Sequence, residues 1–143
     1  MKTSIENNCE ELLDWSDDPV IPYNAIHDAT MLNLVPNVKE LLNSGNDINA
    51  PDDSNQTPLH WASIYCTEVL EFMLHKGGTN LNAQDDVGDT PLIVAARHAR
   101  DDTVTVLLDH GASPLQTNFS KQSPLDVAKL YNNATTVVIL EKL

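Results

Sequence analysis

Histidines and acidic residues are the side chains in this sequence that could support catalysis or bind a metal. His27 and His60 stand 33 residues apart, whereas His98 and His110 have no Cys or His at a ligand spacing. Adjacent acidic pairs occur at Asp52-Asp53, Asp85-Asp86 and Asp101-Asp102. Neighbouring side chains point apart, and no calcium-binding loop with alternating oxygen ligands surrounds these pairs. We therefore expect no catalytic residues, no metal and no cofactor, and we interpret the acidic pairs as solvated loops.

The elements that must position these side chains repeat every 33 residues. The copies read Asn24-Ala25-Ile26-His27-Asp28-Ala29, Thr57-Pro58-Leu59-His60-Trp61-Ala62, Thr90-Pro91-Leu92-Ile93-Val94-Ala95 and Ser123-Pro124-Leu125-Asp126-Val127-Ala128. The first residue of each copy is a good N-cap, and proline suits the first helical position that follows it. The leucine or isoleucine is a predicted buried anchor, and the alanine lets a second helix pack closely. Each copy is therefore predicted to begin a helix.

A second helix follows in each unit, closed by Gly45 in the first unit and by Gly111 in the third. Its predicted core residues are Val38, Leu41 and Leu42, then Val104, Leu107 and Leu108, then Val137 and Leu140. In the second unit, strict spacing would bury Glu71 and His75 without evident partners. We therefore predict that this helix slides by one residue, which places Leu70, Met73 and Leu74 in the core and Gly77 at the helix end.

A 33-residue period headed by T-P-L-H-x-A is typical of the ankyrin-repeat family, which residues 23–143 strongly resemble. The resemblance implies an all-α solenoid of about four helix-pair repeats with β-hairpin finger loops. The repeats would span 23–55, 56–88, 89–121 and, in part, 122–143. It also implies that His27 and His60 bond to neighbouring backbone. Residues 1–22 do not fit the repeat and are predicted to form an acidic N-terminal capping helix and lead-in, with a disordered acidic leader as the alternative.

The net charge and composition of the chain limit the kinds of partner that it can bind. The net charge is −13, from 21 acidic and 8 basic residues, which argues against nucleic acid or an anionic membrane surface and permits a basic protein partner. The sequence shows no signal peptide and no transmembrane stretch of roughly 18 apolar residues. Cys9 and Cys66 make no metal or redox spacing, so we expect free thiols. A cytoplasmic location is therefore predicted.

The resemblance implies a concave binding face made of finger tips and the last turns of the first helices. Its predicted partner-binding residues are Asp53, Gln56, Trp61, Ile64, Tyr65, Asp86, Val87, Asp89, Arg97, His98, Phe119 and Tyr131. We expect Asp53, Asp86 and Asp89 at successive finger positions, where their charges repel unless a partner supplies Lys or Arg. The alternative for Ile64, Tyr65 and Leu130 is packing between repeats.

Together these features predict a non-enzymatic protein–protein interaction module, monomeric when free. It would bind one protein partner through its concave acidic and aromatic face, as an inhibitor or an adaptor. The alternative is an enzyme with an unrecognised hydrolase or metal site in the concave groove. Hydroxylation of Asn49, which the family resemblance suggests, stays open.

Overall fold

The computed structural model of the chain describes residues 25–65 and 67–143. These residues form eight α-helices and no strand: α1 (Ala25–Met31), α2 (Val35–Asn43), α3 (Pro58–Ile64), α4 (Thr67–Lys76), α5 (Pro91–Arg97), α6 (Asp101–Asp109), α7 (Pro124–Leu130) and α8 (Ala134–Glu141). The predicted all-α solenoid is confirmed. The N-terminal helix predicted within residues 1–22 lies outside the described residues, as do Cys9 and Cys66.

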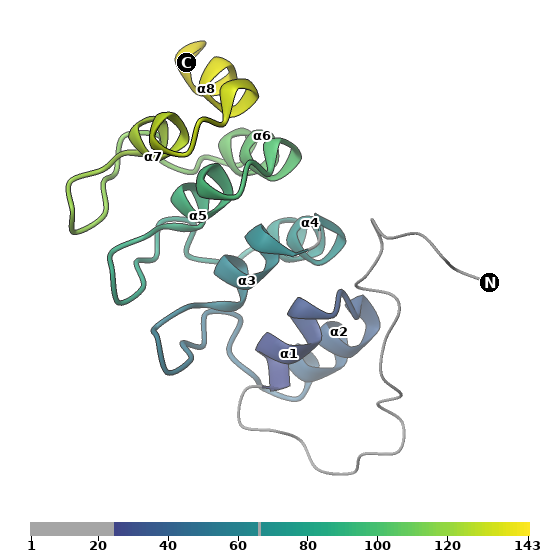
Figure 1. Cartoon of the computed structure of the whole chain (residues 1–143). Helices are drawn as coiled ribbons and strands as arrows, with labels where there is room; N and C mark the ends of the chain where they lie inside the picture. Colours follow the sequence, from purple (N-terminus) through teal and green to yellow (C-terminus); the bar gives the residue numbers. More distant parts are fainter. Residues whose placement is uncertain (1–24, 66) are drawn as a thin grey trace.

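The helices form two layers (Figure 1). The first helices α1, α3, α5 and α7 stack on one another, and the second helices α2, α4, α6 and α8 stack beside them. The loops that join the repeats project beyond the first helices, on the side away from the second helices. This side is where the 33-residue period brings equivalent loop residues into rows.

Side-chain caps start three of the first helices, as predicted. The hydroxyls of Thr57, Thr90 and Ser123 accept hydrogen bonds from the backbone N–H three residues on, at 3.1–3.4 Å. In α7 the carboxylate of Asp126 also accepts the Ser123 N–H, and the bonds to Ser123 hold the pKa of Asp126 below its ordinary value. These two reciprocal hydrogen bonds satisfy the backbone N–H groups of Ser123 and Asp126 at the helix start.

The histidine column has the structural role that the sequence implies. Nε2 of His27 lies 2.8 Å from the Ala50 carbonyl, and Nε2 of His60 lies 2.8 Å from the Asp89 carbonyl. Because Nδ1 of His60 accepts the Thr57 N–H, Nε2 carries the proton and donates. Burial lowers the pKa of His60, although the bond to Asp89 and the nearby acids oppose this shift. His60 therefore ties one repeat to the next as a neutral imidazole.

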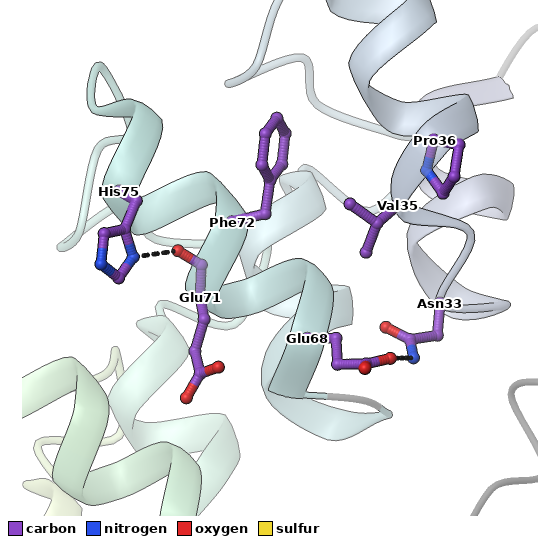
Figure 2. A pocket seen from close by; sticks show the side chains of 7 residues that line it. All are labelled: Asn33, Val35, Pro36, Glu68, Glu71, Phe72 and His75. Atoms are coloured by element: carbon purple, nitrogen blue, oxygen red, sulfur yellow. Dashed lines mark hydrogen bonds between the residues drawn. The ribbon is translucent and has the colours of Figure 1, made fainter.

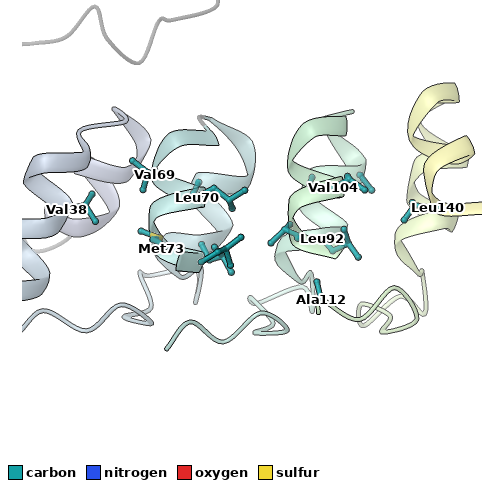
Figure 3. Close-up of a cluster of buried hydrophobic side chains, with 14 of the residues drawn as sticks. Val38, Val69, Leu70, Met73, Leu92, Val104, Ala112 and Leu140 are labelled. Carbon is teal, nitrogen blue, oxygen red and sulfur yellow. The ribbon is translucent and has the colours of Figure 1, made fainter. Parts of the chain in front are cut away.

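The core runs between the two helix layers along the whole array (Figure 3). The labelled core residues are buried, with exposed fractions of 6% or less: Val38, Val69, Leu70, Met73, Leu92, Val104, Ala112 and Leu140. The predicted slide is confirmed, because Leu70, Met73 and Leu74 are buried while Glu71 and His75 are exposed. Of the four anchor positions, the one in the last repeat, Leu125, is only partly buried.

Each finger, as we call the loop between two repeats, ends in a tight turn. In the first finger, the Asp52 N–H donates to the Gln56 carbonyl and the Asn55 N–H donates to the Asp52 carbonyl, both at 2.9 Å. Equivalent bonds close the fingers at 85–89 and 118–122. One further bond joins each finger to the next, from Asp86 N–H to Ser54 O and from Phe119 N–H to Val87 O. These short turns contain no assigned strand, so the predicted β-hairpin form of the fingers is not confirmed.

Candidate functional site

The candidate site is the surface that the finger tips share with the C-terminal ends of the first helices, which we call the finger face. It comprises Asp53, Ser54, Asp86, Val87, Phe119 and Ser120 from the fingers, and Ile64, Tyr65, Arg97, His98, Leu130 and Tyr131 from the helix ends. The period places Asp53, Asp86 and Phe119 at equivalent positions of three successive fingers. The predicted row of acids is therefore wrong in its third member, because Asp89 lies at the base of a finger and not at a tip.

Five large hydrophobic residues are exposed on this face. They are Tyr65 (41%), Val87 (58%), Phe119 (66%), Leu130 (62%) and Tyr131 (51%). The described residues include eight exposed large hydrophobics in all, so the finger face holds most of them. Such concentration on one side is a mark of an interaction surface.

A column of aspartate and asparagine residues shapes each finger. Oδ1 of Asp52, Asp85 and Asn118 accepts the backbone N–H groups two and four residues on, at 2.8–3.0 Å. The sequence interpretation missed this role and described the acidic pairs as solvated. Asp85 is in fact buried, because its carboxylate satisfies finger backbone. The 33-residue spacing of Asp or Asn ahead of each turn was the signal that could have revealed it.

The Trp61 side chain packs against the first finger and stabilises it through a hydrogen bond. Its Nε1–H donates to Oδ2 of Asp52 at 2.9 Å, and its indole meets the edge of His27 at a centroid distance of 6.3 Å. The ring of Tyr65 stacks on the indole, with centroids 5.9 Å apart and planes inclined by 23°. Trp61 is half-buried as a result, while Tyr65 extends the aromatic surface outward from the end of α3. The pair is therefore a rigid part of the finger face.

Asp89 is buried and ties the second finger to the third finger. It is 2% exposed, its Oδ2 accepts from Arg97 Nη1 at 2.5 Å, and its Oδ1 accepts from Asn118 Nδ2 at 3.1 Å. The bond to Asp89 raises the pKa of Arg97. The guanidinium also lies 5.8 Å from the ring centre of Tyr131. Asp89 and Arg97 thus neutralise each other and position Tyr131, so Asp89 presents no surface charge to a partner.

The remaining predicted residues divide between support and surface. Gln56 is half-buried, and its backbone N–H donates to the Asp52 carboxylate. The Gln56 carbonyl oxygen lies 3.1 Å from Nε2 of His27. Ile64 is also half-buried, and its carbonyl accepts from Arg100 Nη1 at 2.7 Å. His98 is exposed on the finger face. The main-chain carbonyls of Gln56 and Ile64 therefore join neighbouring repeats.

Two acids remain exposed at the finger tips. Asp53 and Asp86 stand on adjacent fingers, and Oδ1 of Asp86 accepts from Asn55 Nδ2 at 2.6 Å. Within the described residues, neither carboxylate has a Lys or Arg at ion-pair distance. The exposed acids of the face therefore lie on the first two fingers, while exposed aromatic residues lie at the third finger tip and at the end of α7.

Asn49 lies between repeats and away from this face. Its Oδ1 accepts the Asn80 N–H at 2.8 Å, and its Nδ2 donates to the Gly78 carbonyl at 2.8 Å. One repeat further on, Oδ1 of Asn82 accepts the Ser113 N–H at 2.9 Å. The carboxamide of Asn49 therefore has a structural task in joining repeats.

A groove also lies on the opposite side, between α2 and α4 (Figure 2). It is lined by Asn33, Val35, Pro36, Glu68, Glu71, Phe72 and His75. Asn33 Nδ2 donates to Glu68 Oε1 at 2.6 Å across the groove, and Lys39 Nζ lies 5.4 Å from the Phe72 ring centre.

Across residues 25–65 and 67–143, no three His, Cys, Asp or Glu side chains gather in a way that could hold a metal ion. None of the described helices is long and apolar enough to cross a membrane.

Stacked helix pairs with turn-tipped fingers and inter-repeat histidine bonds define a helical-repeat protein of the ankyrin type. The chain belongs to the ankyrin-repeat family, because the family model described as ankyrin repeats (3 copies) matches residues 4–85, 26–118 and 66–142.

Individual relatives resemble the chain over part of their length. Palmitoyltransferase ZDHHC13 of Mus musculus is 32% identical over 87 residues, which is 60% of this chain and 14% of the relative. Palmitoyltransferase Hip14 of Drosophila melanogaster is 36% identical over 87 residues, which is again 60% of this chain and 14% of the relative. Palmitoyltransferase akr1 of Neurospora crassa is 30% identical over 123 residues, which is 85% of this chain and 17% of the relative. The chain thus spans about a sixth or less of these relatives, and what it shares with them is a repeat segment.

Proposed function

We propose that the chain is a non-enzymatic protein-interaction module that binds one protein partner through the finger face. The observation that carries the proposal is the alignment of exposed hydrophobic residues on this face, with Phe119 on a finger tip and Leu130 and Tyr131 at the end of α7. Exposed aromatic anchors on a rigid support are the residues that contribute most to binding at protein interfaces. A basic partner is part of the proposal, since Asp53 and Asp86 face outward from a chain of net charge −13.

The internal bonding of the side chains in this face supports binding over catalysis. Trp61, Asp89 and Arg97 are held by bonds within the array, so no acid, base or nucleophile among them is left poised for a substrate. In the proposal the module acts as an inhibitor or an adaptor in the cytoplasm, and it covers a surface of its partner. The enzymatic alternative requires a hydrolase or metal site in the concave groove along the finger face.

The relatives suggest one setting for such a module. They are named as palmitoyltransferases, and the segment they share with this chain is the repeat array. In that setting, the array would hold a protein for an enzyme, and the transfer of a palmitoyl group would belong to other parts of the relatives. Binding, not transfer, is therefore the activity that we propose for the residues described.

Affinity capture with matched variants tests the proposal. The immobilised chain, a Phe119→Ala/Tyr131→Ala variant and a Val138→Ala variant would each be exposed to native cell extract. Val138 is similarly exposed but lies on the second helix α8. We expect a stoichiometric partner with the unaltered chain and with Val138→Ala, and its loss with the finger-face variant. Equal capture by all three, or a tightly held metal without a partner, would contradict the proposal.

A further inference from the structure

We propose that the finger face binds an extended segment of its partner in which a Lys or Arg lies about four residues from a bulky apolar residue. The inference rests on the proposed function and specifies the ligand of the same face. It follows from the different chemistry of the two ends of the face and from the spacing of the repeats.

The first two fingers supply the cation site. Asp53 and Asp86 occupy equivalent positions on adjacent fingers, and both side chains are exposed. The fingers are fixed relative to each other by the Asp86 N–H bond to Ser54 O at 3.0 Å and by the Asn55–Asp86 side-chain bond. The carboxylates of Asp53 and Asp86 repel one another in the free chain, and an ammonium or guanidinium that approaches both would reduce that repulsion.

The third finger and the end of α7 supply the apolar site. Phe119 occupies the position that Asp53 and Asp86 hold on the earlier fingers, and its ring is 66% exposed. Its backbone N–H donates to Val87 O at 3.1 Å, and its ring packs against Gly88. Tyr131, held under the Arg97 guanidinium, extends this surface. Because the Phe119 backbone bond and the Arg97–Tyr131 contact already exist in the free chain, less ordering is needed when a partner covers these rings.

The geometry of the array sets the spacing within the ligand. Neighbouring helices pack about 8–10 Å apart, so equivalent residues of successive repeats are separated by about that distance. An extended chain advances about 3.3 Å per residue, or about three residues per repeat. The midpoint between Asp53 and Asp86 lies about one and a half repeats from Phe119, which corresponds to about four residues. A segment with this spacing would satisfy both sites at once.

Selection from a library of random peptides tests the inference directly. The probe is a displayed library of peptides of about ten residues, long enough to cross three repeats. It is selected on the whole chain and on an Asp53→Asn/Asp86→Asn variant, a Phe119→Ala variant and two controls. The control Glu71→Gln/Asp109→Asn removes the same charge from exposed residues of α4 and α6. The control Val138→Ala trims an exposed apolar residue of α8.

We expect the selected peptides to pair a basic residue with a bulky apolar residue about three to five positions away. The double Asn variant should bind them about threefold more weakly and should no longer select for the basic residue. Phe119→Ala should weaken binding about thirtyfold and should no longer select for the apolar residue. The two control variants should select the same peptides as the unaltered chain.

Two results would overturn the inference. One is that no peptide is enriched above the bare support, or that the enriched peptides lack either residue class. The other is that the control variants change the selection as much as the finger-face variants do. Failure of the proposed function is a separate outcome, recognised when the Phe119→Ala/Tyr131→Ala variant captures the native partner as well as the unaltered chain does.

Discussion

The α-carbon of Gly88 lies directly against Phe119 on the next finger. A β-carbon at Gly88 would sit 2.5 Å from the Phe119 backbone nitrogen and 2.7 Å from two of its ring carbons, and the glycine has a φ of +85°. Because Gly88 has no side chain, the aromatic ring of Phe119 on the next finger can pack against it. The packing of neighbouring repeats thus fixes the position of the most exposed aromatic residue on the finger face.

Gly88→Ala should lower the free energy of unfolding by about 2 kcal/mol or more. The left-handed backbone is unfavourable for alanine, and the Phe119 backbone cannot yield as a flexible side chain would. Urea unfolding measures the loss. Lys121→Ala is the control, because Lys121 holds the equivalent position of the next finger with a φ of +64° and already has a β-carbon. A cost at Gly88 no larger than at Lys121 would contradict the close contact.

Leu59→Ala and Leu92→Ala should each cost about 2–5 kcal/mol, because both side chains are buried at the centre of the array. Chemical unfolding of each variant beside Val138→Ala, which removes an exposed side chain, tests the core column. Losses under about 1 kcal/mol at both leucines would show that the column does not form the core.

Thr103→Val should leave the stability unchanged or raise it by about 1 kcal/mol, because the buried Thr103 hydroxyl has no hydrogen-bond partner among the described residues. Thr136 occupies the same position one repeat later, and its hydroxyl donates to Asp101 Oδ1. Thr136→Val should therefore cost about 2 kcal/mol. Thermal unfolding of the two variants would contradict this account if both substitutions had the same effect.

His60 should make the protein less stable as the pH falls. The folded pKa lies below the ordinary value of 6.5, so the unfolded chain binds a proton that the folded chain resists. The contribution of His60 is complete above pH 6.5 and is lost as the pH falls from there towards the lower folded pKa. In this pH window, the unfolding free energy of the His60→Ile variant should depend less on pH than that of the unaltered chain. Isoleucine is the residue of the next repeat at this position, Ile93. An unchanged slope would exclude His60 as the source.

Once a partner is known, charge and aromatic substitutions should affect different rate constants. Asp53→Asn with Asp86→Asn should lower the association rate and its dependence on salt, since long-range attraction acts before contact. Tyr65→Ala should mainly raise the dissociation rate. Stopped-flow binding at two ionic strengths measures both. Thr105→Ala on α6 is the control on the second-helix side, and a larger effect there than at the fingers would place the site on the wrong face.

The sequence by itself determined the features that depend on neighbours along the chain. Caps such as Thr57 and the one-residue slide that buries Leu70 follow from the polar and apolar pattern along the chain. Each is a local requirement of a helix start, a helix face or a turn, so the same residue types recur wherever the same requirement recurs.

Only the tertiary structure decided which finger-face residues are free to meet a partner. Asp89 resembles a surface acid in the sequence, yet Arg97 and Asn118 enclose it, and Phe119 becomes a fixed surface ring only because Gly88 leaves room for it. The contacts of Asn118 and Phe119 join residues about one repeat apart and form only when the repeats stack. The physical reason is that burial and charge pairing are properties of neighbours in space, which a periodic sequence aligns but does not by itself bring into contact.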